Sequence, residues 1–253
     1  MLYIIFLGGV SSYSLPPYNY YIVNFITFTL FFIFIFNKKK VRLRNISFFK
    51  YGWCFGFGYF LCSLYWIIIS LTFDQNFYFL IPFAVVLIPS FLALFYGLVT
   101  YLFSIFYSKK IINSILIFSL FFGLIEFIRG SILTGFPWNL ISFSFSNSIY
   151  FIQIISIIGT YSFNLICITL FTLPAVFVLK KSKKNIVFVS GFILVTVSFV
   201  IFGIYQIKEF NVLPSLKKTY SIKAISSNIS LDIEKFSVSS ASLKRFLTRS
   251  NLS

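Results

Sequence analysis

The sequence has 253 residues, of which 59% are hydrophobic and only 10% charged, and its mean hydropathy is +0.95. A water-soluble domain of this size needs more polar surface to cover its core, so a soluble fold is excluded and a lipid bilayer is the expected solvent. The net charge is +16, from 21 basic and 5 acidic residues, but the basic residues lie in short clusters between apolar runs or in the tail after Leu216. That placement is typical of membrane-protein loops near anionic lipid, so we expect no nucleic-acid partner.

Seven apolar segments are predicted to cross the membrane, because a helix of about 20 apolar residues spans the hydrocarbon core. In chain order they are Leu2–Tyr13, Tyr20–Phe36, Ser47–Leu71, Phe77–Tyr107, Ile111–Ile128, Phe151–Leu179 and Asn185–Ile204. The expected fold class is therefore an all-α polytopic membrane protein of about seven transmembrane helices, with its transmembrane domain over residues 1–204.

The loops between these segments alternate in charge. The second, fourth and sixth loops hold the basic clusters Lys38, Lys39, Lys40, Arg42, Arg44 and Lys50, then Lys109 and Lys110, then Lys180, Lys181, Lys183 and Lys184. The intervening loops contain almost no basic residue. Since basic loops stay in the cytoplasm, the pattern predicts a cytoplasmic N-terminus and a segment after Ile204 that lies outside the cytoplasm.

The tail changes character after the seventh segment. Residues 205–219 read as a linker, and Tyr220–Asn228 alternates polar and apolar side chains as a β-strand does. Val238–Thr248 is predicted to start an amphipathic helix. A strand and one helix cannot bury a core alone, so residues 220–253 are expected to be the incomplete start of a soluble α/β domain.

The absence of certain side chains limits the chemistry. The sequence contains no histidine, which excludes Ser-His and Cys-His catalysis and most zinc sites. Cys54, Cys62 and Cys167 each lie inside an apolar run and form no C-x-x-C pair, so we interpret them as small buried hydrophobes. We expect neither a metal site nor a cofactor.

The most informative stretch is Glu126–Trp138, with the sequence EFIRGSILTGFPW. Glu126 and Arg129 are three residues apart and share one helix face, where ionisable groups near a bilayer are usually paired or functional. We favour a structural ion pair near the outer boundary over a direct substrate role. Gly135 and Pro137 end the helix, and the uncharged, apolar loop that follows is able to line an entrance for acyl chains. Composition alone favours an interfacial aromatic belt for Trp138.

Five collinear blocks resemble the apolipoprotein N-acyltransferases. Glu126–Trp138 is similar to that family's most specific signature, and Gly52–Ser70 is similar to its G-x-x-x-G-F-G…W span. Ser14–Tyr18 (SLPPY) is similar to the turn after the first helix of the family, and Gly159 falls where its sixth span opens. Ile222–Phe236 is similar to the first strand of its periplasmic nitrilase-like domain, although Ser226, Ser227 and Phe236 depart from the family pattern.

The resemblance implies transfer of an acyl chain from a phospholipid to the N-terminal amine of a diacylglyceryl cysteine on a lipoprotein, in a bacterial inner membrane. The family's cysteine nucleophile, glutamate base and oxyanion-stabilising lysine lie beyond the position that matches Ser253, so we expect no catalytic residue in this chain and no activity of the chain on its own. The expected partners are the membrane, the phospholipid donor and the lipoprotein acceptor. Trp138, Phe136 and Trp66 are the candidates for acyl-chain contact.

Two other interpretations remain open at this stage. One is a polytopic binding or transport protein without chemistry, such as a small permease, although mid-membrane ionisable groups, which substrate pathways usually need, are nearly absent. The other is a decayed gene product, which the altered tail motif would suit.

Overall fold

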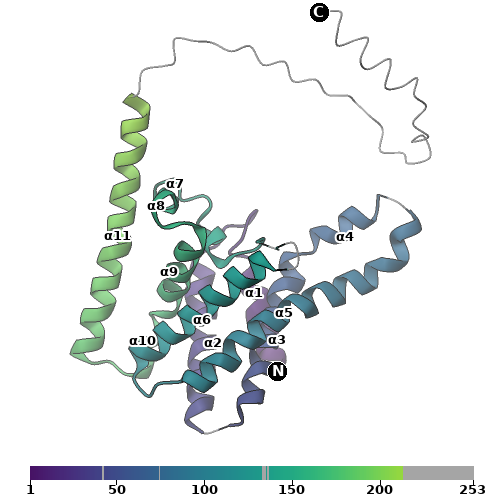
Figure 1. Ribbon diagram of the computed structural model, residues 1–253, viewed down its shortest axis with the longest axis horizontal. Coiled ribbons are helices and arrows are strands. Elements are labelled where there is room, and N and C mark those ends of the chain that lie inside the picture. The colour runs from purple at the N-terminus through teal and green to yellow at the C-terminus, as the bar shows by residue number, and fades with distance from the viewer. Residues whose placement is uncertain (42, 74, 133–134, 136, 213–253) are drawn as a thin grey trace, which may run out of the picture. The chain divides into compact units, whose positions relative to one another are not determined.

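The computed structural model describes residues 1–212 except 42, 74, 133–134 and 136 (Figure 1). Within these residues the regular elements are all helical: α1 (Leu2–Ser12), α2 (Ile22–Lys40), α3 (Asn45–Ser63), α4 (Trp66–Leu71), η1 (Gln75–Leu80), α5 (Ile81–Phe106), α6 (Ile111–Ser131), η2 (Ile141–Phe145), α7 (Ile149–Ile152), α8 (Ile155–Ile158), α9 (Thr160–Thr172), α10 (Ala175–Leu179) and α11 (Lys183–Val212). The predicted strand Tyr220–Asn228 and helix Val238–Thr248 lie outside the described residues.

Five helical segments of the described chain are long and apolar enough to cross a membrane. They are Ile22–Lys40, Tyr78–Phe106, Ile111–Ser131, Thr160–Leu179 and Lys183–Phe210. The other two predicted segments are also helical, but α1 has only 11 residues and the 19-residue α3 is less apolar than the five. An all-helical membrane fold is thus confirmed for the described residues, and the total of seven crossings stays a prediction.

The predicted sixth segment, Phe151–Leu179, starts too early. Residues 149–158 form two short helices, α7 and α8, and the spanning segment begins at Thr160. Gly159 separates them with a φ of +77°, a conformation outside the right-handed helical region that glycine adopts without a steric penalty. Hydropathy misses this break because both sides of Gly159 are equally apolar.

The predicted third segment, Ser47–Leu71, is also two helices. α3 ends at Ser63 and α4 begins at Trp66. The Ser63 carbonyl accepts a hydrogen bond from the Asn139 side-chain amide at 3.3 Å, while the Ile67 N–H donates to the Leu64 carbonyl. A tertiary contact therefore occupies the carbonyl that a continuous helix would pair with residue 67.

At the chain's far end, α11 extends beyond the predicted end at Ile204. It runs to Val212 and so includes the first residues of the range 205–219 that the sequence assigned to a linker. α11 packs on α7 near Gly203, which lies against the backbone of Tyr150.

Glycines allow α3 to pack closely between α1 and α5, the helices that it contacts most. Gly52 and Gly56 of the G-x-x-x-G motif face α5, where a Cβ on either would overlap Tyr96. Gly58 faces α1, and a Cβ there would overlap the carbonyl oxygen of Ile5. Small residues at helix interfaces in membranes permit such backbone approach, and van der Waals packing is the main force that joins the helices.

We predict that Gly58→Ala lowers the free energy of unfolding by about 1–3 kcal/mol, because the added methyl meets backbone that cannot rotate away. Gly191→Ala is the matched control, since a Cβ at this exposed position of α11 meets nothing within 4 Å. Thermal unfolding in detergent measures both variants. Equal unfolding temperatures for the two would show that α1 and α3 do not pack through this glycine.

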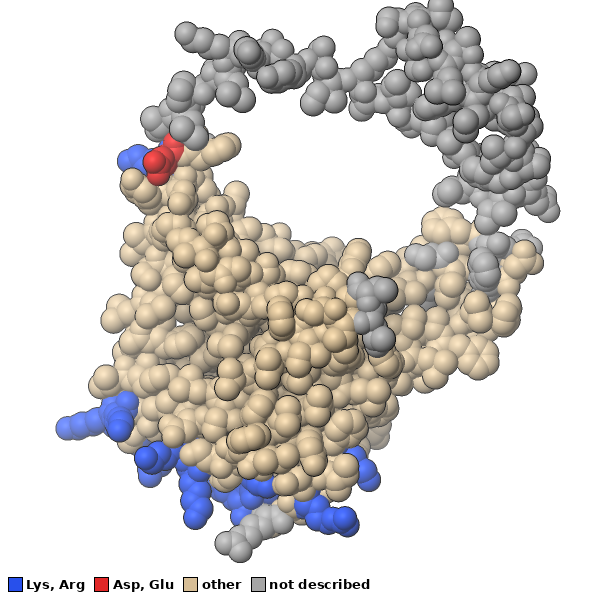
Figure 2. Space-filling model, in the orientation of Figure 1, with Lys and Arg blue, Asp and Glu red and all other residues tan. Residues whose placement is uncertain are grey.

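Lys and Arg side chains gather at one end of the described helices (Figure 2). The α2–α3, α5–α6 and α10–α11 connections lie at that end (Figure 1), and they contain the three basic clusters of the sequence. The structure therefore brings together, at one end, the loops that the charge pattern grouped on one side of the membrane.

Candidate functional site

A buried ion pair lies near the end of α6, away from the basic loops. Glu126 and Arg129 are each only 1% exposed, and Arg129 Nε donates to Glu126 Oε2 at 2.9 Å while Nη2 contacts the same oxygen. The Tyr96 hydroxyl on α5 donates to Glu126 Oε1 at 2.8 Å. The carboxylate thus has partners on both oxygens, as a buried charge requires.

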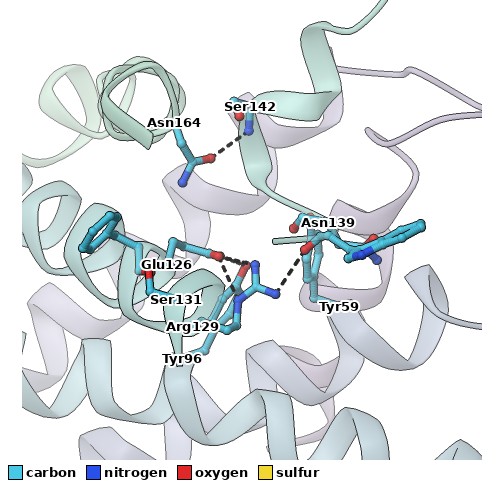
Figure 3. Close-up of polar contacts among 10 residues, drawn as sticks. Tyr59, Tyr96, Glu126, Arg129, Ser131, Asn139, Ser142 and Asn164 are labelled. Atoms are coloured by element: carbon cyan, nitrogen blue, oxygen red, sulfur yellow. Dashed lines mark hydrogen bonds and ion pairs between the residues drawn. The ribbon is translucent and has the colours of Figure 1, made fainter. Parts of the chain in front are cut away.

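The same guanidinium group reaches the loop after α6 (Figure 3). Arg129 Nη1 donates to the Trp138 carbonyl at 3.1 Å. The guanidinium carbon of Arg129 lies 5.3 Å from the Phe60 ring centroid, a favourable distance for a cation over an aromatic ring. Arg129 therefore links α6, α3 and the loop that carries Trp138.

Tyr59 and Asn139 fasten this loop to α3 (Figure 3). The fully buried Tyr59 hydroxyl donates to the Asn139 carbonyl at 3.0 Å, and the Asn139 amide donates back to the Ser63 carbonyl. Asn139 has a φ of +58°, which asparagine tolerates better than most residues. Consecutive carbonyls, of residues 138 and 139, are thus held by two buried side chains.

An apolar pocket of about 980 Å³ opens beside this loop. Three segments far apart in sequence line it: the α1–α2 turn with Leu15, Pro16, Pro17 and Tyr18, the end of α3 and the start of α4 with Leu61, Cys62, Tyr65 and Trp66, and the loop after α6 with Pro137, Trp138 and Asn139. The Trp66 and Trp138 rings lie 5.6 Å apart, centroid to centroid. No charged side chain is among the described residues that line the pocket, which suits a hydrocarbon ligand.

Of the site residues proposed from sequence, the structure brings Trp66 and Trp138 together in this pocket and joins Glu126 to Arg129 directly beneath the loop. Phe136 lies outside the described residues. Sequence reasoning missed Tyr59, Tyr96 and Asn139. Tyr59 and Asn139 fall in or directly after the Gly52–Ser70 and Glu126–Trp138 blocks, so their position beside these motifs was an available signal. No local sequence pattern marks Tyr96, because it lies 30 residues before Glu126 in the chain.

A family model described as the apolipoprotein N-acyltransferase N-terminal domain matches residues 7–173. This range includes the ion pair and every segment that lines the pocket. The chain belongs to the apolipoprotein N-acyltransferase family. The resemblance of the five sequence blocks is confirmed for those that lie within the matched range.

Curated relatives support the same assignment. The chain is 32% identical over 184 residues to the apolipoprotein N-acyltransferase of Rhizobium etli, covering 70% of this chain and 34% of the relative. It is 35% identical over 175 residues to that of Rhodopseudomonas palustris and 39% identical over 160 residues to that of Rickettsia prowazekii; these cover 68% and 62% of this chain and 32% of each relative. The chain thus spans about a third of the length of the apolipoprotein N-acyltransferases that it matches.

We predict that Arg129→Met destabilises the fold by about 3–5 kcal/mol, because it leaves the Glu126 carboxylate buried without its cation. The double variant Glu126→Gln/Arg129→Met removes both charges and should recover part of this loss. Unfolding in detergent gives the free energies, and near-ultraviolet circular dichroism follows the Trp66–Trp138 ring pair. A double variant less stable than Arg129→Met would contradict the predicted coupling.

Proposed function

We propose that this chain forms the membrane domain of an apolipoprotein N-acyltransferase and that its pocket receives an acyl chain of the phospholipid donor. The observation that carries the proposal is the facing pair Trp66 and Trp138 in an uncharged pocket. A volume of about 980 Å³ lies within the range of pockets that bury a ligand of several tens of atoms, and an aromatic and proline wall favours hydrocarbon over a charged headgroup.

In this proposal Glu126 and Arg129 are positioning residues. Arg129 contacts the Trp138 carbonyl and does not line the pocket. Its effect on lipid binding therefore acts through the position of the loop. A rigid attachment reduces the ordering that the loop must undergo when lipid binds. Phe136, two residues before Trp138, is proposed as a third acyl contact on the grounds of its place in the GFPW motif.

The acyl chain would then pass to the N-terminal amine of a diacylglyceryl cysteine on a lipoprotein. The resemblance assigns the cysteine nucleophile, the glutamate base and the lysine to the nitrilase-like part of the family, in the two thirds of the relatives that this chain does not cover. None of Cys54, Cys62 and Cys167 is proposed as the nucleophile, and we expect residues 1–253 alone to transfer no acyl group.

We further propose seven crossings of a bacterial inner membrane, with the basic end in the cytoplasm and the pocket at the periplasmic boundary. Counting α1 and α3 as crossings places the basic loops on one side, as the positive-inside bias requires. Glycine-mediated packing of α3 against α1 and α5 supports this count, since a helix so tightly packed between neighbours shares their environment.

To test the pocket, residues 7–173 are exchanged into the Rickettsia prowazekii relative and acyl transfer from phospholipid to a diacylglyceryl peptide is measured. We predict that Trp138→Ala lowers the initial rate by at least about tenfold, equivalent to about 1.4 kcal/mol of lost binding or positioning. Leu120→Ala, an exposed apolar residue on α6, is the control and should keep the rate of the unmutated exchange. Equal rates for the two variants would exclude the pocket from the reaction.

Topology is tested with single cysteines in a chain whose Cys54, Cys62 and Cys167 are replaced by Ala. A membrane-impermeant maleimide added to intact spheroplasts should label Ser146→Cys, in the loop at the pocket end, and should label Lys109→Cys only after lysis. Both positions are exposed in the structure. The reverse labelling pattern would place the pocket in the cytoplasm and contradict the proposed orientation.

A further inference from the structure

We propose that the basic end of this protein is a binding surface for the headgroups of anionic phospholipids. The basic end is defined by eleven described residues: Lys38, Lys39, Lys40, Arg44, Lys50, Lys109, Lys110, Lys180, Lys181, Lys183 and Lys184. This site differs from the pocket in place and in chemistry, and it does not depend on the acyl-transfer proposal.

No acidic side chain of the described residues lies at the basic end. Glu126 and Glu209 are the acidic residues of the described chain. Glu126 is buried against Arg129 and lies 15 residues along α6 from the basic end, roughly 22 Å at the rise of an α-helix. Glu209 is near the opposite end of the 30-residue helix α11 (Figure 2). The counter-charge for eleven cations must therefore come from outside the described chain.

The position of these cations indicates that lipid is the source of the counter-charge. Long apolar helices begin or end directly beside them: α2 ends at Lys40, α6 begins after Lys110, and α11 begins at Lys183. Residues at the ends of membrane-crossing helices lie at the depth of lipid headgroups, where each Lys or Arg is attracted to an anionic leaflet. The charges also belong to three separate connections, so several helices of the bundle contribute to the surface.

The structure further distinguishes fixed cations from available ones. Lys39 is half-buried, and its Nζ donates to Asn45 Oδ1 at 2.7 Å and lies 5.5 Å from the Phe48 ring centroid, so it already has protein partners. The other ten are exposed. Lys38 and Lys40 fold back over Phe34 and Phe36, at 5.6 and 4.8 Å from the ring centroids, which holds their ammonium groups near the hydrocarbon edge where phosphate oxygens lie.

The test uses tryptophan quenching by lipids with brominated acyl chains. The variant Ile46→Trp, at an exposed position of α3 between Arg44 and Lys50, reports on the basic end when Trp53, Trp66 and Trp138 are replaced by Phe, and Trp138 alone reports on the pocket end. The full chain is reconstituted in phosphatidylcholine vesicles with brominated phosphatidylglycerol or brominated phosphatidylcholine as the minor component. We expect the Ile46→Trp reporter to be quenched more by the anionic lipid and Trp138 to be quenched equally by both.

Matched single-charge variants locate the effect. Lys50→Gln should lower the anionic-lipid preference of the Ile46→Trp reporter by about three- to fivefold, in line with the attraction of one basic residue to an anionic surface. Lys208→Gln, at the opposite end of α11, should leave it unchanged. Millimolar inorganic phosphate should not abolish the preference, because the surface binds lipid headgroups in the membrane and not a free ion. Abolition of the preference would assign the surface to soluble phosphate and overturn the proposal.

Equal quenching of the Ile46→Trp reporter by both lipids, or equal effects of Lys50→Gln and Lys208→Gln, would also overturn it. Native mass spectrometry of the unmutated protein tests the same lipid preference without the tryptophan variants, whose fold could be lost. Purified from a membrane with equal amounts of both lipids, it should retain phosphatidylglycerol in preference to phosphatidylcholine, and retention of both in equal amounts would contradict the proposal.

Discussion

The buried Arg129 guanidinium is the interaction on which the arrangement around the pocket depends. A charge in an apolar interior is stable only when its hydrogen-bonding positions are filled, and Arg129 donates to Glu126 and to the Trp138 carbonyl while its guanidinium packs over the Phe60 ring. These partners come from α6, the following loop and α3. Satisfying one cation therefore determines how three elements meet, and Tyr96 adds a fourth by donating to Glu126.

The attachment of the loop explains how a non-helical segment persists beside apolar helices. Backbone without helical hydrogen bonds is tolerated there only when protein groups satisfy it, and Arg129 and Tyr59 do so for the carbonyls of residues 138 and 139. The Trp138 ring is left on the surface of the pocket, half exposed, against Trp66. Polar groups beneath the loop thus create an apolar site above it.

The two ends of the bundle have opposite character. Around the pocket, the charges of the described residues are confined to a buried pair, and the accessible wall is aromatic and proline-rich. At the basic end, eleven cations have no acidic neighbour among the described residues. A molecule with these two ends has a defined orientation in a bilayer, because moving the basic loops across the hydrocarbon costs several kcal/mol for each charge. One end is suited to acyl chains and the other to phosphate headgroups.

The sequence by itself determined the solvent, the helical class and the family of this protein. Hydropathy found the helices, and the alternation of basic loops grouped Lys38–Lys40, Lys109 and Lys180 correctly, because both signals are carried by composition over many residues. The motif blocks also located Trp66, Trp138, Glu126 and Arg129. Only the tertiary structure decided that the SLPPY turn, the end of α3 and the GFPW loop meet around one pocket, and that Tyr59 and Tyr96 support it. It also decided that α3 stops at Ser63, whose carbonyl accepts a hydrogen bond from the Asn139 amide. The hydrogen bonds among these contacts join residues 30 to 80 positions apart, and such pairings leave no periodic trace in the sequence, since they depend on where packed helices bring side chains together.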